Sequence, residues 1–442
     1  MSSLASQTIA ILGAGRSGLG AARLARQQGA EVIIFDEGDA VKTDKLDAEG
    51  FLSVTGQAAR DLTVKPGEFQ QVIISPGLDE HWPLPEKFTD AGVPLIGETE
   101  FAFNLTSMSM AAITGTNGKS TCTELIATLF NGCGFKSVPC GNHGMSLSEV
   151  VASGVNYDVL ALEISSFQLE TIKNFRARAS LWLNFAPDHL DRYPDMESYY
   201  AAKARIFENV TRDDFAIVRA GETVHTGLAQ RWTFSAYGDA ADFTYANGGF
   251  YHEGQKFGSA ERLKLRGKHN MENVLAALMT GRVFGLSRTE MLKALAAYEP
   301  PRHRCELVRT LRDREYINDS KATNLHALEA CLRSQERPIV LIAGGKDKEL
   351  DYTPLRAQLN GQVRAMVLIG EIAEQLERTF GDLLPCKRGK DMAEAVALAT
   401  ELSQPGDAII LSPGTSSFDM YTGYAQRGEV FREAVNALTE PN

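Results

Sequence analysis

The chain has 442 residues, enough for roughly three domains of about 150 residues each. Its content of 44% apolar and 23% charged residues is typical of a globular protein, and no apolar run approaches the ~18 residues that span a membrane. A net charge of −11 argues against general binding of nucleic acids or anionic membranes, because both require a broad basic surface.

Targeting and redox signals are absent from the sequence. Residues 1–7 show no basic segment followed by an apolar one, so we expect no signal peptide and a cytoplasmic location. The six cysteines include no C-x-x-C pair, which argues against a zinc site or a thioredoxin-type site. We expect most of them to be small buried apolar residues in a reducing compartment.

The N-terminal part of the chain alternates strand-like and helix-like segments. Short apolar strands are predicted over residues 8–12, 31–35 and 71–74. Helical patterns between strands predict right-handed βαβ crossovers and a parallel sheet.

A glycine-rich turn follows the first of these strands. Gly13, Gly15 and Gly18 match the G-x-G-x-x-G pattern, and Asp36 lies about twenty residues further on, as in dinucleotide-binding folds. The pattern fits a hydride-transfer enzyme or a site for a nucleotide-sugar diphosphate. Alternatively, the glycines only allow the helix to pack closely on the strand and bind no ligand.

A second glycine-rich turn spans residues 115–121, between an apolar stretch at 110–113 and a predicted helix at 122–130. Strand, glycine-rich turn, Lys-Ser/Thr and helix form the arrangement that holds nucleotide phosphates, because backbone N–H groups and the helix dipole face the anion. The match to G-x-x-x-x-G-K-[ST] is incomplete, since Ile113 occupies the first glycine position. An exposed turn is the alternative interpretation.

Two buried strands, predicted at 159–164 and 180–184, follow this turn and end in polar residues. Ligands bind at the carboxyl ends of strands in such sheets. Glu163 is therefore a candidate Mg²⁺ ligand and His189 a candidate site residue, against solvated or structural alternatives. Lys203 lies on a predicted helix, where a lysine is unremarkable.

A third α/β unit follows a predicted linker at 300–304, where paired prolines stop a helix. Its strands are predicted over residues 316–319, 338–343, 366–370 and 408–412. Polar turns at 318–324, 344–348 and 412–418 end three of them. These turns predict a rim with several cations, suited to a ligand that carries carboxylates or phosphates.

Taken together, these motifs resemble the Mur ligases of peptidoglycan synthesis over nearly the whole chain. The residues that carry the resemblance are 115–121, 141–142, 163–168, 188–194, 203, 269–270, 273, 318–324 and 412–413. The run from Asp319 to Asn324 is the most specific, because relatives that add other amino acids carry different residues there.

The resemblance implies three α/β domains. Residues 1–97 would form a Rossmann-like domain that binds the UDP-sugar. Residues 98–303 would form a P-loop-type ATPase domain with a parallel sheet. Residues 304–442 would form a Rossmann-like domain that binds the amino acid.

The resemblance also implies a reaction, the ATP-dependent addition of D-glutamate to UDP-N-acetylmuramoyl-L-alanine. The L-alanine carboxylate would attack ATP to give an acyl phosphate, from which the amine of D-glutamate expels phosphate. Because two anions must meet, Lys119 and Mg²⁺ are needed to neutralise them. We expect a monomer that binds neither nucleic acid nor membranes.

Site roles follow from the same resemblance. ATP would be bound by Gly115, Thr116, Asn117, Gly118, Lys119, Ser120, Thr121, Asn270, Asn273, Arg304 and Asp319. The UDP-sugar would be bound by Gly15, Arg16, Ser17, Asp36, Ser75, Gly77, Asn142, Ser165, Gln168 and His189. Glutamate would be bound by Lys321, Thr323, Lys348, Ser417, Phe418 and Tyr424.

The catalytic group would consist of Lys119, Glu163, His189 and Lys203. Ser120 and Glu163 would hold one Mg²⁺, and His189 a second together with Lys203. Carbamylation of Lys203 turns a cation into an oxygen ligand, which Mg²⁺ prefers.

Alternatives remain at this point. Thr422 and Gly423 stand where Lys-Asn is common in the family, so a relative that adds L-glutamate or another amino acid is possible. An NAD-dependent oxidoreductase would explain the first glycine turn but leaves Lys119, Glu163 and Lys321 without roles. A protein that binds these ligands without catalysis is the third alternative.

Overall fold

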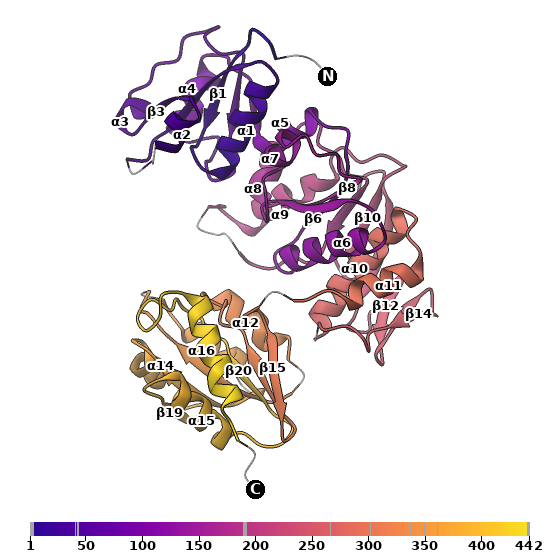
Figure 1. The fold of residues 1–442 in the computed structure, drawn as a ribbon, viewed down its shortest axis with the longest axis vertical. Helices are drawn as coiled ribbons and strands as arrows, with labels where there is room; N and C mark the ends of the chain where they lie inside the picture. The colour runs from indigo at the N-terminus through magenta and orange to yellow at the C-terminus, as the bar shows by residue number, and fades with distance from the viewer. Residues whose placement is uncertain are drawn as a thin grey trace. The chain divides into compact units, whose positions relative to one another are not determined.

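The computed structural model describes residues 4–39, 41, 44–188, 192–265, 267–300, 302–335, 337–348, 350–359 and 361–439. The chain divides into two compact units, Met1–Tyr298 and Glu299–Asn442. Three sheets lie along the chain, two in the first unit and one in the second (Figure 1). No helix in the described ranges is both long and apolar enough to cross a membrane.

The first sheet is parallel throughout, with strand order β3-β2-β1-β4-β5. Its strands are β1 (Thr8–Leu12), β2 (Glu31–Asp36), β3 (Leu52–Thr55), β4 (Gln71–Ile74) and β5 (Leu95–Gly97). The helices of this region are α1 (Arg16–Gln27), α2 (Asp44–Ala48), α3 (Gln57–Arg60), α4 (Pro83–Asp90) and α5 (Glu98–Asn104). The predicted parallel βαβ arrangement is confirmed.

The second sheet has nine strands in the order β14-β13-β12-β11-β10-β9-β6-β8-β7. Its strands are β6 (Ser109–Thr114), β7 (Ser137–Gly141), β8 (Val159–Glu163), β9 (Ala179–Trp182), β10 (Phe215–Arg219), β11 (Gln230–Ser235), β12 (Phe243–Ala246), β13 (Gly249–His252) and β14 (Gln255–Ser259). The strands from β6 to β12 pair in parallel, whereas β12, β13 and β14 form an antiparallel meander that the sequence analysis did not predict.

The helices of the second sheet's region follow the same alternation. They are α6 (Lys119–Gly132), α7 (Leu147–Ala152), α8 (Ser166–Glu170), α9 (Met196–Ala204), the 3₁₀ turn η1 (Arg205–Phe207), α10 (Lys268–Val283) and α11 (Arg288–Ala296). Helix α6 packs against both α10 and α11 (Figure 1).

The third sheet has the order β15-β16-β20-β17-β18-β19, antiparallel only between β15 and β16. Its strands are β15 (Glu306–Leu311), β16 (Arg314–Asn318), β17 (Ile339–Gly344), β18 (Val363–Ile369), β19 (Cys386–Arg388) and β20 (Ala408–Leu411). Its helices are α12 (Leu325–Arg333), η2 (Thr353–Leu355), α13 (Arg356–Leu359), α14 (Ala373–Phe380), α15 (Met392–Leu402) and α16 (Tyr424–Asn436).

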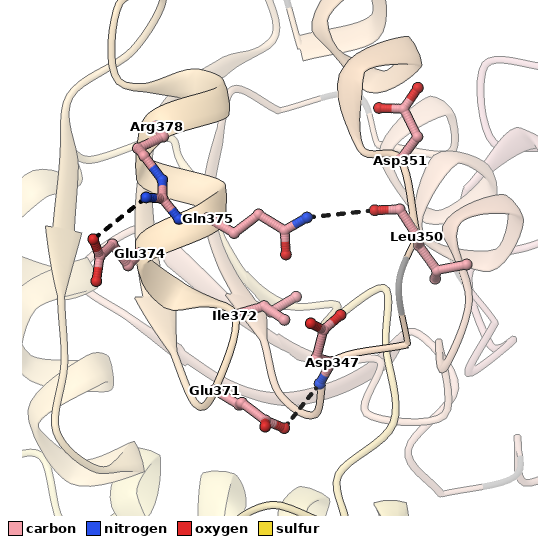
Figure 2. Close-up of a pocket in the computed structure, with 8 residues that line it drawn as sticks. All are labelled: Asp347, Leu350, Asp351, Glu371, Ile372, Glu374, Gln375 and Arg378. Atoms are coloured by element: carbon pink, nitrogen blue, oxygen red, sulfur yellow. Dashed lines mark hydrogen bonds and ion pairs between the residues drawn. The ribbon is translucent and has the colours of Figure 1, made fainter.

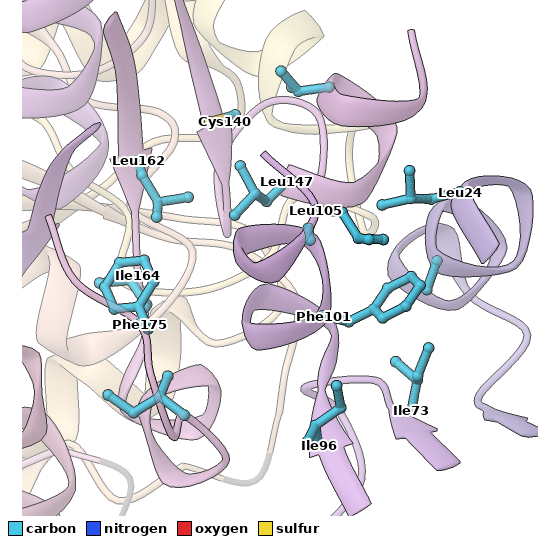
Figure 3. Close-up of a cluster of buried hydrophobic side chains, with 14 of the residues drawn as sticks. Leu24, Ile73, Ile96, Phe101, Leu105, Cys140, Leu147, Leu162, Ile164 and Phe175 are labelled. Atoms are coloured by element: carbon cyan, nitrogen blue, oxygen red, sulfur yellow. The ribbon is translucent and has the colours of Figure 1, made fainter. Parts of the chain in front are cut away.

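The first two sheets belong to one unit because a single apolar cluster joins them. Leu24 of α1 and Phe101 of α5 belong to the same buried cluster as Leu147 of α7 and Leu162 of β8 (Figure 3). This continuous core explains why the first compact unit extends past residue 97. The domain boundary expected at 97/98 stays a prediction.

A smaller aromatic cluster stabilises the other face of the first sheet. Phe88 of α4 is fully buried and makes edge-on contacts with Phe35 and Phe69, at ring-centroid distances of 5.3 Å in both cases. Such contacts add to the free energy gained by burying the rings.

We predict that Phe88→Ala lowers the free energy of unfolding by about 3–5 kcal/mol, because it removes a buried ring and leaves a cavity. The matched control is Leu52→Ala, since Leu52 is 62% exposed on β3 of the same sheet. Urea unfolding followed by circular dichroism measures both. Equal losses in the two variants would contradict the prediction.

Candidate active site

The turn after β6 leads directly into α6, as the phosphate-loop interpretation predicts. Gly118 has φ 83° and immediately precedes α6, with no side-chain hydrogen bond capping the helix. Any larger residue would be strained at this φ, and its Cβ would lie 2.6 Å from Oδ1 of Asn273, which would have to move. The backbone N–H groups at the start of α6 are therefore directed to the loop, where an anion can accept their hydrogen bonds.

The segment after β9 holds this loop in place. The Asn184 side chain accepts a hydrogen bond from the Asn117 N–H at 2.8 Å and donates one to the Asn117 carbonyl at 3.0 Å. The Thr116 N–H donates to the Asn184 carbonyl at 3.0 Å, and the Thr116 hydroxyl donates to the Ala186 carbonyl at 3.1 Å. The loop conformation thus depends on a neighbouring strand end as well as on its glycines.

Two lysines converge on one carbonyl oxygen in the loop. Lys119 Nζ donates to the Gly115 carbonyl at 2.8 Å and to the Thr116 carbonyl at 2.9 Å. Lys203 Nζ donates to the same Gly115 carbonyl at 3.1 Å and lies over the Tyr199 ring, 4.7 Å from its centroid. Two cationic groups near one another create a strong preference for anions.

Burial makes the charges of these lysines costly. Lys203 is 1% exposed, and burial together with the nearby Lys119 charge lowers its pKa from 10.5 to about 7. Burial also lowers the pKa of Lys119, against the opposing charges of Glu163 and Asp188. A large fraction of Lys203 is therefore the neutral amine at neutral pH, which the sequence analysis did not predict.

Glu163 provides an uncompensated buried oxygen close to these cations. Its carboxylate is 2% exposed and ends β8; Oε1 accepts a hydrogen bond from Asn142 Nδ2 at 2.8 Å. Oε2 is buried and has no hydrogen-bond partner among the residues that the structure describes. Because an orphaned buried carboxylate oxygen is costly, this atom fits a cation ligand such as Mg²⁺. His189, the other expected metal ligand, lies outside the described residues.

Helix α10 borders the loop on a further side. Asn273 is buried, and its side chain lies against Gly118. Burial lowers the pKa of His269 to about 4, so its ring is neutral. Asn270 is partly exposed in the first turn of α10. Of the expected adenine contacts, the structure thus places Asn273 directly against the phosphate loop.

The first glycine turn also forms as expected. The Asp36 carboxylate accepts hydrogen bonds from the N–H groups of Ala14 at 2.7 Å and Gly38 at 2.8 Å. A Cβ at Gly18 would lie 1.8 Å from the Gly13 carbonyl, and Ser75 lies against Gly13. The turn, Asp36 and Ser75 therefore meet at the carboxyl ends of β1, β2 and β4.

Other residues expected at the UDP-sugar are also located. Arg16 is largely exposed, with Nε 3.9 Å from a Glu149 oxygen. Ser165 and Gln168 form a capping box that begins α8, and Gln168 is buried. The partly exposed Ser17 lies in the first turn of α1, and the exposed Gly77 lies in the turn after β4.

In the second unit, polar turns gather as the sequence analysis predicts. Lys348 Nζ donates to the Thr323 carbonyl at 3.1 Å, and Lys321 Nζ lies 6.0 Å from the centroid of the Tyr424 ring. Ser417 is buried and Phe418 is 67% exposed. Arg304 is partly exposed. The buried Asp319 accepts a hydrogen bond from the Ser412 hydroxyl at 2.8 Å.

A buried arginine joins these turns. Arg427 on α16 is 1% exposed and donates to the carbonyls of Ser320, at 2.9 Å, and Thr415, at 3.2 Å. Burial lowers its pKa to about 10. Because its partners are backbone carbonyls from two separate loops, Arg427 fixes their spacing. Sequence reasoning missed this residue, although Arg427, Phe431 and Val435 recur at a spacing of four, as one buried helix stripe requires.

A nearby cavity of about 590 Å³ does not suit a dicarboxylate. Four carboxylates and one guanidinium line it, together with Leu350, Ile372 and Gln375 (Figure 2). The carboxylates are those of Asp347, Asp351, Glu371 and Glu374. These negative charges would repel a dicarboxylate ligand. The turns joined by Arg427 therefore remain the candidate amino-acid site.

Comparisons with known proteins agree with this geometry. The family model described as the Mur ligase middle domain matches residues 113–281, and that described as the Mur ligase, glutamate ligase domain matches residues 303–414. A curated relative from Trichlorobacter lovleyi, UDP-N-acetylmuramoylalanine–D-glutamate ligase, is 39% identical and covers 97% of this chain and 98% of its own. The chain belongs to the Mur ligase family.

Solved structures show the same fold at low identity. MurC of Thermotoga maritima, a UDP-N-acetylmuramate–alanine ligase, has a TM-score of 0.57 at 17% identity and covers 98% of this chain and 99% of its own. MurF ligase of Thermotoga maritima in complex with ADP has a TM-score of 0.56 at 13% identity, covering 98% and 96%. This Mur ligase is an ATP-dependent enzyme that forms amide bonds, and the NAD-dependent alternative is set aside.

We predict that Asn184→Ala weakens ADP binding to this Mur ligase by about 1–3 kcal/mol, because the N–H and carbonyl of Asn117 lose their partners. Isothermal titration calorimetry with ADP measures the change. Asn131→Ala is the matched control, since Asn131 bridges the backbone of Ser137 in the same way near the other end of α6. Equal ADP affinity in wild type and Asn184→Ala would refute the role of Asn184.

Proposed function

We propose that this Mur ligase adds D-glutamate to UDP-N-acetylmuramoyl-L-alanine, with ATP activating the L-alanine carboxylate as an acyl phosphate. The substrate assignment is supported by relatives with this printed activity, at 39% and 37% identity over nearly the whole chain. The observation that carries the chemistry is the pair of lysines on the Gly115 carbonyl, the partly buried Lys119 and the buried Lys203, with the buried Oε2 of Glu163 nearby. We further propose a cytoplasmic monomer.

Charge neutralisation is the main task of this site. The attacking carboxylate and the ATP phosphates are both anions, so their approach is opposed until cations screen them. Lys119, at the start of α6, would move from the loop carbonyls to the phosphates when ATP binds. Mg²⁺, when bound, would supply further positive charge on the phosphates, one ion held by Ser120 and Glu163 and a second held in part by His189.

Lys203 has the properties that carbamylation requires. Its neutral amine is available near pH 7, and only a neutral amine attacks CO₂. Carbamylation would convert the Lys203 amino group into an anion. The repulsion between the charged forms of Lys203 and Lys119 would then become an attraction. The resulting carbamate oxygens suit Mg²⁺. We therefore propose carbamylated Lys203 as the second-site metal ligand with His189.

The UDP-sugar would bind at the first glycine turn. Asp36 already orders this turn through the Ala14 N–H, and Arg16 is exposed beside it. Asn142, an expected contact of the UDP-sugar, donates a hydrogen bond to Glu163, the expected Mg²⁺ ligand, and so would connect the two binding sites. The remaining UDP-sugar contacts expected from the sequence, at Gly15, Ser17, Ser75, Gly77, Ser165 and Gln168, stay proposals.

Glutamate would bind at the turns that Arg427 joins. Its two carboxylates call for two cations, and Lys321 and Lys348 are two of the three lysines in these turns. Thr323, Ser417, Phe418 and Tyr424 would complete the pocket. Asn270 and Asn273 would contact adenine, Asp319 the ribose and Arg304 the terminal phosphate of ATP.

We predict phosphate release from ATP only when UDP-N-acetylmuramoyl-L-alanine and D-glutamate are both present. A coupled phosphate assay compares D-glutamate, L-glutamate and meso-diaminopimelate at equal concentrations, with omission of the UDP-sugar as the control. No release with any amino acid would overturn the ligase assignment. Release with L-glutamate alone would overturn the assigned stereochemistry.

We predict that Lys203→Ala lowers kcat about a hundredfold or more and that formate or acetate partly restores it, because a free carboxylate can replace the carbamate. Lys119→Ala is the matched control, since an added anion cannot replace a lost cation. Bicarbonate should activate the wild type more at pH 8 than at pH 6, because the neutral amine increases as pH rises through about 7. Absence of rescue together with unchanged bicarbonate dependence would contradict carbamylation.

A further inference from the structure

Three side chains that commonly bind metals gather in the second unit. The Cys305 thiol, the Cys331 thiol and the Asp319 carboxylate have ligand atoms within 4.8 Å of one another. In the described parts of the chain this is the one such group of three His, Cys, Asp or Glu residues. The argument from sequence against a zinc site rested on the absence of a C-x-x-C pair. It did not cover ligands that lie far apart in the sequence, as these three do.

The fold itself brings these residues together. Strands β15 and β16 are antiparallel and Glu306 pairs with Asn318, so Cys305 and Asp319 adjoin the same end of the hairpin. Cys331 comes from α12, whose Leu328 and Leu332 pack into the same apolar cluster as Cys331. The three ligands thus sit on a strand pair and a packed helix, elements that hold ligand geometry rigidly.

The ligand atoms are already oriented. The two sulfurs lie 3.6 Å apart. Asp319 accepts a hydrogen bond from the Cys305 N–H at 3.1 Å on Oδ1 and from the Ser412 hydroxyl at 2.8 Å on Oδ2. Hydrogen bonds of this kind orient the carboxylate ligands of metal sites. Asp319 and Cys331 are almost fully buried, while Cys305 is partly exposed and offers a route of entry.

We propose that Cys305, Cys331 and Asp319 form a binding site for a thiophilic divalent cation of the Zn²⁺ class. Two thiolates on a tetrahedral Zn²⁺ ion, with Zn–S bonds of about 2.3 Å, lie about 3.8 Å apart, close to the separation of the two thiols here. Water completes the four ligands of an open three-residue site. Thiolates select soft cations, so this site is distinct from any Mg²⁺ held by oxygen ligands at the phosphate loop.

A disulfide is the competing outcome for the two thiols. It would require the sulfurs to close to about 2.0 Å and an oxidant such as a peroxide, which would take up the two electrons. Contact with Cys305 and burial raise the pKa of the Cys331 thiol well above its usual value. Thiols of high pKa are slow nucleophiles, whereas a bound Zn²⁺ ion deprotonates its thiol ligands.

Cation binding would also affect catalysis, a consequence that rests on the proposed role of Asp319 at the ATP ribose. A cation on the Asp319 carboxylate would withdraw it from the nucleotide. Binding would release two thiol protons, so affinity should increase as pH rises. We therefore expect micromolar Zn²⁺ to raise the KM for ATP and a chelator to reverse the effect.

The test is anaerobic titration of the reduced full chain with Co²⁺, followed by displacement with Zn²⁺. We expect one equivalent of Co²⁺ to give sulfur-to-metal charge-transfer absorption and the intense visible bands of a tetrahedral site. Cys305→Ser and Cys331→Ser should each weaken Co²⁺ binding roughly tenfold or more, since loss of even an outer-shell partner costs this much. Cys386→Ser is the matched control, because Cys386 lies on β19 at the opposite edge of the same sheet.

Circular dichroism checks that each variant is folded. If one cysteine variant fails to fold, the other still tests the site. Absence of thiolate bands at one equivalent would overturn the site, as would bands that persist in both Cys305→Ser and Cys331→Ser. A mass loss of two hydrogens in air, without Co²⁺ binding under anaerobic conditions, would assign a disulfide instead. Because the readout is spectroscopic, failure of the ligase assay leaves this test unaffected.

Discussion

The carbonyl oxygen of Gly115 is the point on which the candidate active site depends. Both Lys119 and Lys203 donate to it, so two amino groups share one weak acceptor in a mostly buried place, where charge on both is costly. Such an arrangement is costly without an anion. Two further features suit the site to charged ligands. Asn184 fixes the loop that would bind an anion, and the unpaired oxygen of Glu163 is available to a cation.

The supporting contacts are mostly between side chains and backbone. Asn184 holds the phosphate loop, Asp36 holds the first glycine turn, and Arg427 holds two loops of the second unit. Each of these side chains fixes a backbone conformation through its hydrogen bonds. Other side chains therefore remain available to bind substrates. A site prepared in this way loses less conformational entropy on binding.

Much of this organisation could be predicted from the sequence, because apolar strands and polar strand ends leave clear patterns. The parallel sheets and the turns at Gly13 and Gly118 are confirmed. The strands β3, β5, β7, β10, β11 and β19, the meander β12–β14 and the edge strand β15 were not predicted. β15, for example, has one buried position among six, so no apolar run marks it in the sequence. Lys203 was placed on a helix as an ordinary lysine; its burial beside Tyr199 depends on tertiary packing, which local sequence does not show. Roles of individual site residues remain predictions.

The apolar cluster shared by the first two sheets bears on synthesis at the ribosome. Leu24 and Phe101 can complete their packing only after Leu147 and Leu162 have emerged. The nascent N-terminal sheet therefore exposes one apolar face of its helices while roughly sixty further residues are added, a state that invites chaperone binding. The second unit has apolar clusters of its own, so the packing of its core does not wait for residues of the first unit and is complete once α16 is released.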